Sequence, residues 1–345
     1  MPPQVEVGLI LTLTLRGLFL STYDQIREAA IEAERWGFDS VWLCDHFFTM
    51  DPGAYARQKK FPGAEEEDSS AEAEDGSQPL LEAWTTLSAL ARDTTRLRLG
   101  TSVLCVGYRN PAVLAKMAAT LDVISGGRLE MGIGAGWMEA EYAAYGFPYP
   151  KASVRIAQLE EAVQIMKRMW TDPHPTFEGE HFRIRNAVCD PPPVQKPHPP
   201  IWIGGEGKKV LRVAAQHADR FNARWWPPER FLERAPEIEA ASREFGRPDG
   251  ALSPSLMSML IPEKSRADAE AERANYASIP DEGVIAGTPA DCVARIRPYL
   301  RAGVRRFLFT IPNLAERPER LRLAGEEVVP AIRSLGADSA LRAGS

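Results

Sequence analysis

The sequence has few cysteines, and none of them is spaced to pair with another. Cys44, Cys105, Cys189 and Cys292 lie far apart, and no Cys-x-x-Cys motif is present. Such a distribution indicates neither a thiolate metal site nor a redox-active dithiol. We therefore expect buried free thiols in a protein of a reducing compartment, the cytoplasm.

Long apolar runs and concentrated positive charge are also missing. No stretch reaches the ~20 uninterrupted apolar residues that a membrane-spanning helix needs, and the N-terminus lacks the basic-then-apolar pattern of a signal peptide. The formal net charge is −6, whereas nucleic acids and anionic membranes are bound by basic surfaces. The expected partner is a small-molecule substrate, with no nucleic acid and no membrane.

Several motifs of common chemistries are absent as well. There is no GxSxG nucleophile elbow and no GxxxxGK[ST] phosphate loop. The histidines other than His46 lack the HxxxH or HxE spacing of metal ligands, so no metal site is predicted. These histidines are His174, His181, His198 and His217.

Length and composition fit one large globular domain. Of the 345 residues 44% are apolar and 26% charged, which is ordinary for a soluble protein with a sizeable core. A barrel of eight βα units takes roughly 250 residues and tolerates insertions. We therefore expect a single domain over residues 1–345.

Apolar runs of strand length alternate with segments of helical period along the whole chain. Several of these helices carry start signals, such as Thr22 followed by Gln25, the pair Asn110-Pro111 and the pair Thr288-Pro289. About eight repeats of strand and helix predict a parallel sheet that closes into a (β/α)8 TIM barrel, with an open doubly wound sheet as the alternative. The expected strands are 5–12, 40–46, 96–106, 129–135, 200–205, 220–223, 252–261 and 306–311.

Insertions interrupt this alternation after strand two, before strand five and after strand seven. Residues 51–78 are acidic and poor in apolar residues, which predicts a mobile segment that is either a lid or disordered. Residues 171–199 follow a helix and contain a predicted hairpin on the face opposite the active site. The charged stretch 262–286 is a second candidate lid, and residues 335–345 are expected to be a flexible tail.

Asp45 and His46 stand where the second strand should end. In a TIM barrel the carboxyl ends of the strands form the active site. A histidine there can act as a general acid or base, or donate a hydrogen bond to a cofactor ring, with the neighbouring carboxylate helping to fix its tautomer. A purely structural histidine at the strand end is the alternative.

Two glycine-rich segments follow the fourth and fifth strands. The first lets a ligand approach the main chain closely, or is simply a tight barrel turn; its spacing is not that of the GxGxxG dinucleotide motif. The second leads into a helix whose amino end suits an anion such as phosphate, or it is a plain strand-to-helix turn. The candidate residues are Gly134, Ala135, Gly136, Gly204, Gly205, Glu206 and Gly207.

Taken together, a series of motifs in this order resembles the luciferase-like monooxygenase superfamily, over nearly the whole chain. Within it the chain is most similar to the branch that uses the deazaflavin coenzyme F-420 (F420). The motifs are Ser40-Val-Trp-Leu-Cys-Asp-His-Phe47, Pro79-Leu-Leu-Glu-Ala-Trp84, Leu99-Gly-Thr-Ser-Val103, Asn110-Pro111, Gly134-Ala-Gly-Trp137 and Pro200-Ile-Trp-Ile-Gly-Gly205, extended by Glu139 to Gly146 and Gly287-Thr-Pro289.

The resemblance implies a cofactor site at the carboxyl ends of the strands. The cofactor ring would lie against the end of the third strand, Thr101, Ser102 and Val103, where a non-proline cis peptide between Ser102 and Val103 forms a bulge. His46 would lie near the reactive ring carbon, with Asp45 beside it. The main chain of the two glycine segments would hold the ribityl phosphate. Family members are usually dimers or larger, so a homodimer or higher homo-oligomer is expected.

The resemblance also implies hydride transfer between F420 and a small organic substrate. The alternatives are an FMN-dependent monooxygenase, which takes reduced flavin and oxygen, and a non-catalytic flavin-binding barrel. Trp137 stands where the sugar-phosphate dehydrogenases of the branch carry a glutamate acid, and Met50 replaces their active-site tryptophan. These two departures argue against a sugar phosphate as substrate.

Overall fold

The computed structural model describes residues 4–12, 20–49, 79–205 and 207–343. Met50 and the acidic insertion predicted over 51–78 lie outside these ranges, so the prediction of a mobile segment stays a prediction. The chain divides into two compact units. Unit 1 comprises 1–82, 223–234 and 254–345, and unit 2 comprises 83–222 and 235–253.

Unit 1 is built on parallel strands. β1 pairs with β12 on one side and β2 on the other, and β10 pairs with β12 and β11. Its strands are β1 (Glu6–Ile10), β2 (Ser40–Leu43), β10 (Ser253–Pro262), β11 (Val284–Gly287) and β12 (Arg306–Thr310). Its helices are α1 (Tyr23–Arg35), α9 (Arg266–Ala274), η2 (Asp281–Gly283), α10 (Pro289–Arg301), α11 (Glu319–Leu323), η3 (Ala324–Val328) and α12 (Val329–Ala343).

Unit 2 carries parallel strands in the order β3-β5-β8-β9, with β4 also paired to β5. Its strands are β3 (Arg98–Thr101), β4 (Leu104–Cys105), β5 (Leu129–Gly134), β8 (Ile201–Gly204) and β9 (Arg220–Arg224), beside the hairpin β6 (Phe177–Glu178) and β7 (Arg183–Ile184). Its helices are α3 (Ala83–Asp93), η1 (Val106–Tyr108), α4 (Pro111–Ser125), α5 (Glu139–Ala144), α6 (Ala152–Thr171) and α7 (Lys208–His217), and α8 (Pro228–Glu244) follows β9.

The helix start signals in the sequence act as predicted. Thr22 and Gln25 form a reciprocal capping box at the start of α1. Asn110 accepts hydrogen bonds from the first-turn amides of α4, and Thr288 caps α10. Each cap satisfies amide groups that have no partner within the helix, so local sequence alone fixes where these three helices begin.

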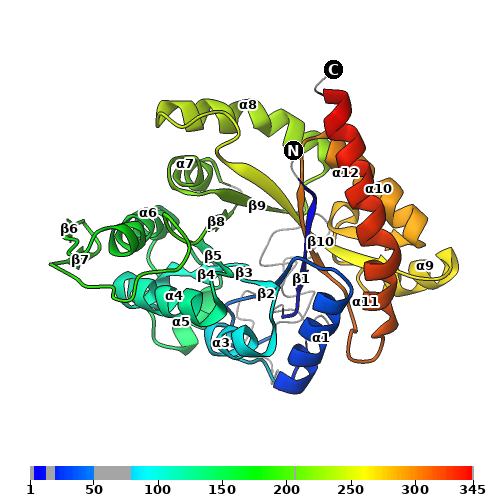
Figure 1. Ribbon diagram of the computed structural model, residues 1–345, viewed down its shortest axis with the longest axis horizontal. Coiled ribbons are helices and arrows are strands. Elements are labelled where there is room, and N and C mark those ends of the chain that lie inside the picture. Colours follow the sequence, from blue (N-terminus) through cyan, green and yellow to red (C-terminus); the bar gives the residue numbers. More distant parts are fainter. Residues whose placement is uncertain (1–3, 13–19, 50–78, 206, 344–345) are drawn as a thin grey trace. The chain divides into compact units, whose positions relative to one another are not determined.

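In the described part of the chain eight parallel strands alternate with helices (Figure 1). The fold is a (β/α)8 TIM barrel, as predicted. Apolar side chains from the strands fill the core, for example Leu9, Val41 and Phe307, which are all fully buried. The predicted hairpin before strand five is confirmed as β6 and β7. The predicted third strand is interrupted, and β3 and β4 occupy its two ends.

The segment predicted as a second lid, 262–286, contains regular structure. Ser265 caps α9, and β11 extends the sheet by pairing Met259 of β10 with Val284. A role in closing the site stays a prediction.

Two helices differ from the sequence-based expectations. α12 continues as a helix to Ala343 through the range expected to be a flexible tail. α5 was not expected from the sequence.

His217, the last residue of α7, is a largely buried base that the fold keeps neutral. Burial and the charges of Lys167 and Arg247 lower its pKa to about 4. Glu160 Oε1 lies 3.7 Å from His217 Nε2, too far for a hydrogen bond. Only 12% of the side chain is exposed, so water does little to stabilise the protonated ring.

We therefore expect His217 to make the fold sensitive to mild acid. Between pH 6.5 and about 4 the unfolded chain binds a proton at this residue that the folded chain does not bind, so stability falls as the pH drops. His217→Gln removes this titration and should lose about 2–3 kcal/mol less than the wild type between pH 7 and pH 4.5. Urea unfolding at the two pH values measures the difference. Equal losses in both proteins would show that His217 is not held neutral.

Candidate active site

A β-bulge interrupts the third strand of the barrel in unit 2. Leu99 is opposite Leu129 of β5, an offset of 30, whereas Leu104 is opposite Ile133, an offset of 29. One extra residue is therefore inserted in Thr101–Val103. Bulges of this kind redirect side chains and are common beside active sites.

The bulge has the main-chain conformation that the family resemblance implied. The peptide bond between Ser102 and Val103 is cis. Thr101 is fully buried and its Oγ1 donates to the carbonyl of Gly132 at 2.8 Å. Ser102 and Val103 are partly exposed, so the bulge presents surface at the carboxyl end of β3.

Glycines on the neighbouring strands make room for the bulge. A Cβ at Gly132 would overlap the carbonyl of Thr101, and one at Gly134 would lie 2.7 Å from Val103 Cγ2. At Gly204 of β8 a Cβ would lie 3.3 Å from Val103 Cγ1. The side chain of Val103 therefore occupies space that glycine leaves open on two other strands, and larger residues at these positions would push the bulge outward.

A buried tyrosine packs against the predicted glycine turn after β5. Gly136 has a φ of 74°, and a Cβ there would overlap the Tyr142 hydroxyl and lie 2.5 Å from Cys105 Sγ. Tyr142 is fully buried and its hydroxyl is 2.8 Å from Cys105 Sγ. Burial raises the pKa of Tyr142, so the phenol stays neutral. Ala135 and Gly136 remain partly exposed.

The second predicted turn follows β8 and opens α7. Gly205 has a φ of 148°, and Gly207 is the N-cap of α7 without a side-chain hydrogen bond to the first turn. Uncapped amides at the positive end of a helix suit an anion. Lys208 and Lys209 are exposed, and Glu206 lies outside the described residues. We name the glycine cradle the first turn, 134–136, together with the described residues 204, 205 and 207 of the second.

Arg155 adds a buried cation next to the first of these turns. It is 8% exposed, its guanidinium lies 4.0 Å from the ring centroid of Tyr149, and it donates to the carbonyl of Pro150 at 2.5 Å. Tyr149 in turn donates to the carbonyl of Trp137 at 3.0 Å. Among the described residues no carboxylate pairs with Arg155, and its Nε has no hydrogen-bond partner. A buried guanidinium of this kind is suited to bind an anion.

Asp45 and His46 follow β2 in unit 1, where they were predicted. Asp45 is buried and His46 is partly exposed. The main chain before them is fixed, because Cys44 N donates to Thr12 Oγ1 at 3.0 Å. Burial and the charge of Asp45 raise the pKa of the Cys44 thiol to about 12, so this thiol is not a nucleophile. The influence of Asp45 on the tautomer of His46 stays a prediction.

The structure thus brings the predicted residues of unit 2 together around the bulge and the glycine cradle. Sequence reasoning did not identify Arg155, Tyr142 or Asn222, whose side chain contacts the bulge. Arg155 had a detectable signal, because a cation in the first turn of a helix is electrostatically unfavourable and implies another role. Tyr142 and Asn222 had none, since only the tertiary fold places them.

The sequence also led to expectations about the cysteines, metal sites and membrane-spanning helices. All four cysteines are buried and free, as predicted. Within the described ranges no group of three or more His, Cys, Asp or Glu side chains is placed to hold a metal ion. In the same part of the chain no helix is both long enough and apolar enough to cross a membrane.

Comparisons with known proteins identify the family of the chain. A family model described as luciferase-like monooxygenase matches residues 9–280. An F420-dependent glucose-6-phosphate dehydrogenase of Amycolatopsis mediterranei is 27% identical over 340 residues, 90% of this chain and 94% of that protein. A phthiodiolone/phenolphthiodiolone dimycocerosates ketoreductase of Mycobacterium sp. (strain JLS) is 31% identical over 237 residues, 67% of this chain and 60% of that protein.

A solved structure shows the same fold. It is an F420-dependent secondary alcohol dehydrogenase in complex with an F420-acetone adduct, with a TM-score of 0.75 and 22% sequence identity. The alignment covers 95% of this chain and 99% of that chain. With a family model that matches most of its length, this chain belongs to the luciferase-like monooxygenase family.

Proposed function

We propose that this protein is an F420-dependent oxidoreductase that transfers hydride between the deazaflavin and a small organic substrate. The observation that carries the proposal is the glycine cradle beside the bulge, with the buried cation of Arg155 next to it. Together they fit a flat ring that bears an anionic chain. The name of the Amycolatopsis relative, which is similar over 90% of this chain, supports F420 as the cofactor.

Each part of the site has a role toward this cofactor. Ser102 and Val103 would support the ring, and the uncapped amides of α7 and the guanidinium of Arg155 would bind its phosphate. A deazaflavin has carbon in place of the flavin N5, so it supplies hydride chemistry and does not readily activate oxygen. The task of the chain is then to orient the two reactants and exclude side reactions.

His46 is proposed as the acid and base of the reaction. When a carbonyl is reduced its oxygen gains a proton, and when an alcohol is oxidised its oxygen loses one. A partly exposed imidazole at the carboxyl end of β2 can supply and accept this proton near neutral pH. The buried carboxylate of Asp45, the preceding residue, would stabilise the protonated imidazole.

The substrate is proposed to be a carbonyl compound or the corresponding alcohol. One relative is named a dehydrogenase and the other a ketoreductase. A sugar phosphate is disfavoured, because by the family resemblance Trp137 replaces the glutamate acid of the sugar-phosphate dehydrogenases of this branch. The carbonyl of Trp137 accepts the hydrogen bond from Tyr149, which fixes the main chain at this position.

Calorimetric titration with oxidised F420 and with FMN tests the cofactor. Tight binding of F420 and weak binding of FMN support the proposal. Tight FMN binding, together with oxygen consumption in the presence of reduced FMN, would establish the monooxygenase alternative instead. The family description favours this alternative as the second candidate. If both cofactors bind but no substrate is turned over, the non-catalytic barrel becomes the better description.

The substrate class is tested with the F420-loaded protein. Reduced F420 is offered acetone and cyclohexanone, and oxidised F420 is offered 2-propanol, cyclohexanol and glucose 6-phosphate, while the deazaflavin absorbance is followed. Turnover of ketones or secondary alcohols supports the proposed class. Turnover of glucose 6-phosphate alone would overturn it and would show that Trp137 does not prevent use of a sugar phosphate.

We also propose that the protein is cytoplasmic and forms a homodimer. Four buried free thiols are typical of a reducing compartment.

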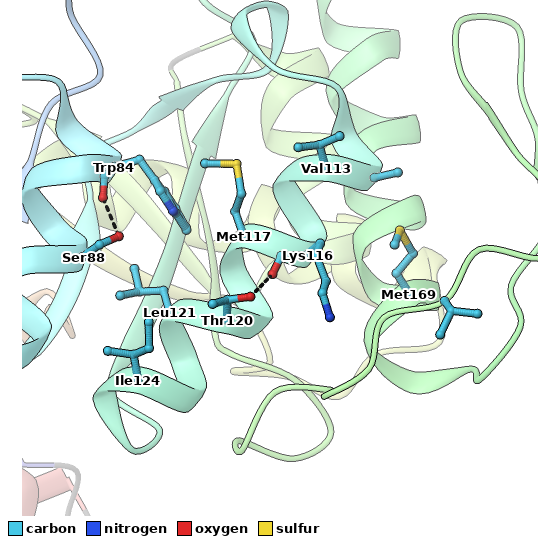
Figure 2. Close-up of a pocket in the computed structure, with 11 residues that line it drawn as sticks. Trp84, Ser88, Val113, Lys116, Met117, Thr120, Leu121, Ile124 and Met169 are labelled. Carbon is cyan, nitrogen blue, oxygen red and sulfur yellow. Dashed lines mark hydrogen bonds between the residues drawn. The ribbon is translucent and has the colours of Figure 1, made fainter.

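The outer face of α4 carries side chains at positions 113, 117, 120 and 124, spaced by four, three and four residues, which is the period of a coiled-coil seam. Val113 is 56% exposed and Ile124 is 40% exposed. Figure 2 shows these side chains lining a hollow together with Trp84 and Ser88 of α3.

A charge placed in this seam should separate the dimer. Ile124→Glu puts a carboxylate on the seam and should convert a dimeric protein to a monomer, because an unpaired charge in an apolar interface is costly. Val123→Glu is the matched control, since Val123 is also 40% exposed but does not line the hollow. Light scattering after size-exclusion chromatography measures the mass. A monomeric wild type, or equal behaviour of the two variants, would exclude this interface.

A further inference from the structure

Tyr149 stands between two anion-binding features of unit 2. Its hydroxyl donates to the carbonyl of Trp137 at 3.0 Å, and Trp137 directly follows the turn 134–136 of the glycine cradle. The centroid of its ring lies 4.0 Å from the guanidinium carbon of Arg155. One phenol therefore contacts both the main chain that leaves the turn and the buried cation.

The local sequence restricts the main chain at Tyr149. Pro148 and Pro150 flank it, and a residue that precedes proline is confined to extended conformations. The stretch 147–150 has no regular secondary structure, so the prolines and the side-chain contacts hold it. The ring of Tyr149 also packs on that of Tyr142, with the centroids 4.9 Å apart and the planes at 66°.

Tyr142 provides a second support for the same turn. It is fully buried, and its hydroxyl occupies the space that a Cβ at Gly136 would need. The turn is thus supported by Tyr142 at Gly136 and by the hydroxyl of Tyr149 at Trp137. Because the two rings pack on each other, a change at Tyr149 affects both supports.

Arg155 is held in place but keeps donors for a ligand. A guanidinium has five N–H donors, and among the described residues its one hydrogen bond is from Nη1 to the carbonyl of Pro150, at 2.5 Å. The other fixed contact is the ring of Tyr149, which attracts a cation placed over its face. Arg155 is 8% exposed, so these two contacts fix a buried cation whose other donors can serve an anion.

We infer that Tyr149 is a positioning residue, which sets the distance between the turn 134–136 and the guanidinium of Arg155 so that both bind the same phosphate group of F420. The inference rests on the proposed function, in which these elements hold the cofactor phosphate. The alternative is a merely structural tyrosine, whose loss would weaken the binding of any ligand to the same extent. The two roles differ in whether the effect depends on the phosphate.

Two substitutions separate the hydroxyl of Tyr149 from its ring. Tyr149→Phe removes only the hydrogen bond and should weaken the binding of oxidised F420 about fivefold in calorimetric titration, the factor of about one hydrogen bond. Tyr149→Leu also removes the ring from Arg155 and should weaken binding about tenfold to a hundredfold. Tyr145→Leu is the control, since Tyr145 is 55% exposed, and should keep the wild-type affinity. Wild-type affinity in Tyr149→Leu would overturn the inference.

A deazaflavin that ends at its ribityl hydroxyl and lacks the phosphate tests which part of the cofactor is affected. The wild type, Tyr149→Phe and Tyr149→Leu should all bind this compound with the same affinity, because the contacts that Tyr149 positions are then not made. If Tyr149→Leu weakens the binding of F420 and of the phosphate-free compound by the same factor, Tyr149 is merely structural.

Double variants test whether the ring acts through Arg155. Arg155→Gln removes the cation and with it the attraction to the ring. In this background Tyr149→Leu should weaken F420 binding no more than Tyr149→Phe does, since the ring no longer has a guanidinium to position. The same difference between the Leu and Phe variants with and without Arg155 would show that the ring acts independently of this cation.

Hydrogen exchange of the cofactor-free protein gives a readout that does not depend on F420. The peptide that covers residues 134–138 should exchange faster in Tyr149→Phe than in the wild type, because the turn loses one of its supports. Tyr145→Phe is the control and should leave this peptide unchanged. Unchanged exchange in Tyr149→Phe would overturn the positioning of the turn. If the wild type binds no F420, the proposed function fails, while this measurement still decides whether Tyr149 holds the turn.

Discussion

His46→Gln should lower the rate of hydride transfer by about two to four powers of ten and leave the affinity for F420 nearly unchanged. The expected factor is that of a lost general acid or base. Glutamine retains a hydrogen-bonding side chain of similar size but cannot carry the proton that the substrate oxygen gains or loses. Single-turnover absorbance changes of the bound deazaflavin, with the ketone or alcohol that the wild type accepts, measure the rate.

The pH profile and a control distinguish catalysis by His46 from general damage. The rate of the wild type should depend on pH through the proton that His46 carries, and this dependence should be missing in His46→Gln. His198→Gln is a suitable control, because the ring of His198 contacts the carbonyl of Pro199 and Trp170 in unit 2. A His46→Gln protein that retains the wild-type rate and pH profile would remove His46 from the mechanism.

The parts of the fold that depend on local sequence could be predicted well. Thr22, Asn110 and Thr288 satisfy amides within their own first turn, so the information lies within a few residues. The alternation of apolar runs and helical periods predicted the barrel, with an open doubly wound sheet as the alternative. The hairpin of β6 and β7 followed from its Glu178-Gly179 turn.

The bulge itself could not be found by counting residues. It arises because β3 and β5, about thirty residues apart in sequence, pair with a register that changes by one between Leu99 and Leu104. Only the family resemblance indicated it. The same limit applies to Asn222, since its partner Ser102 is 120 residues away.

Arg155 and the stretch 262–286 show a second limit, which concerns charge. From composition alone, charged residues are expected to be solvated, and the charged stretch 262–286 was therefore predicted as a candidate lid. In the structure Glu263, Glu272 and Arg320 are largely buried and neutralise one another. Arg155 is buried as well, but no described carboxylate neutralises it. Whether a buried charge stabilises the fold or serves a ligand depends on its partner, which the sequence does not reveal.

Arg320 holds the segment after β10 to the segment after β12. Its Nη2 lies 2.6 Å from Glu263 Oε1 and 2.9 Å from Glu272 Oε2, and its Nη1 donates to the carbonyl of Pro312 at 3.0 Å. Arg317 also donates to Glu263, at 3.1 Å. Arg320 is 1% exposed, so this is a buried ion-pair network rather than a surface one.

Arg320→Met should therefore reduce the free energy of unfolding at pH 7 by about 3–5 kcal/mol, because it leaves two carboxylates without their buried counter-ion. Burial acts to raise the pKa of Glu272, but the hydrogen bond and the charge of Arg320 outweigh it and hold this pKa below its usual value. The stabilisation is present above the unfolded pKa of about 4.3 and is lost as the pH falls through the folded one. The deficit of Arg320→Met should accordingly shrink in acid.

Urea unfolding of both proteins at pH 7 and near pH 4 measures this change. Arg322→Met is the matched control, since Arg322 lies on the same helix with 63% of its side chain exposed and pairs with Glu326 at 3.2 Å. An exposed pair of this kind contributes at most about 1 kcal/mol. If Arg320→Met costs no more than Arg322→Met, the network does not hold 262–286 in place.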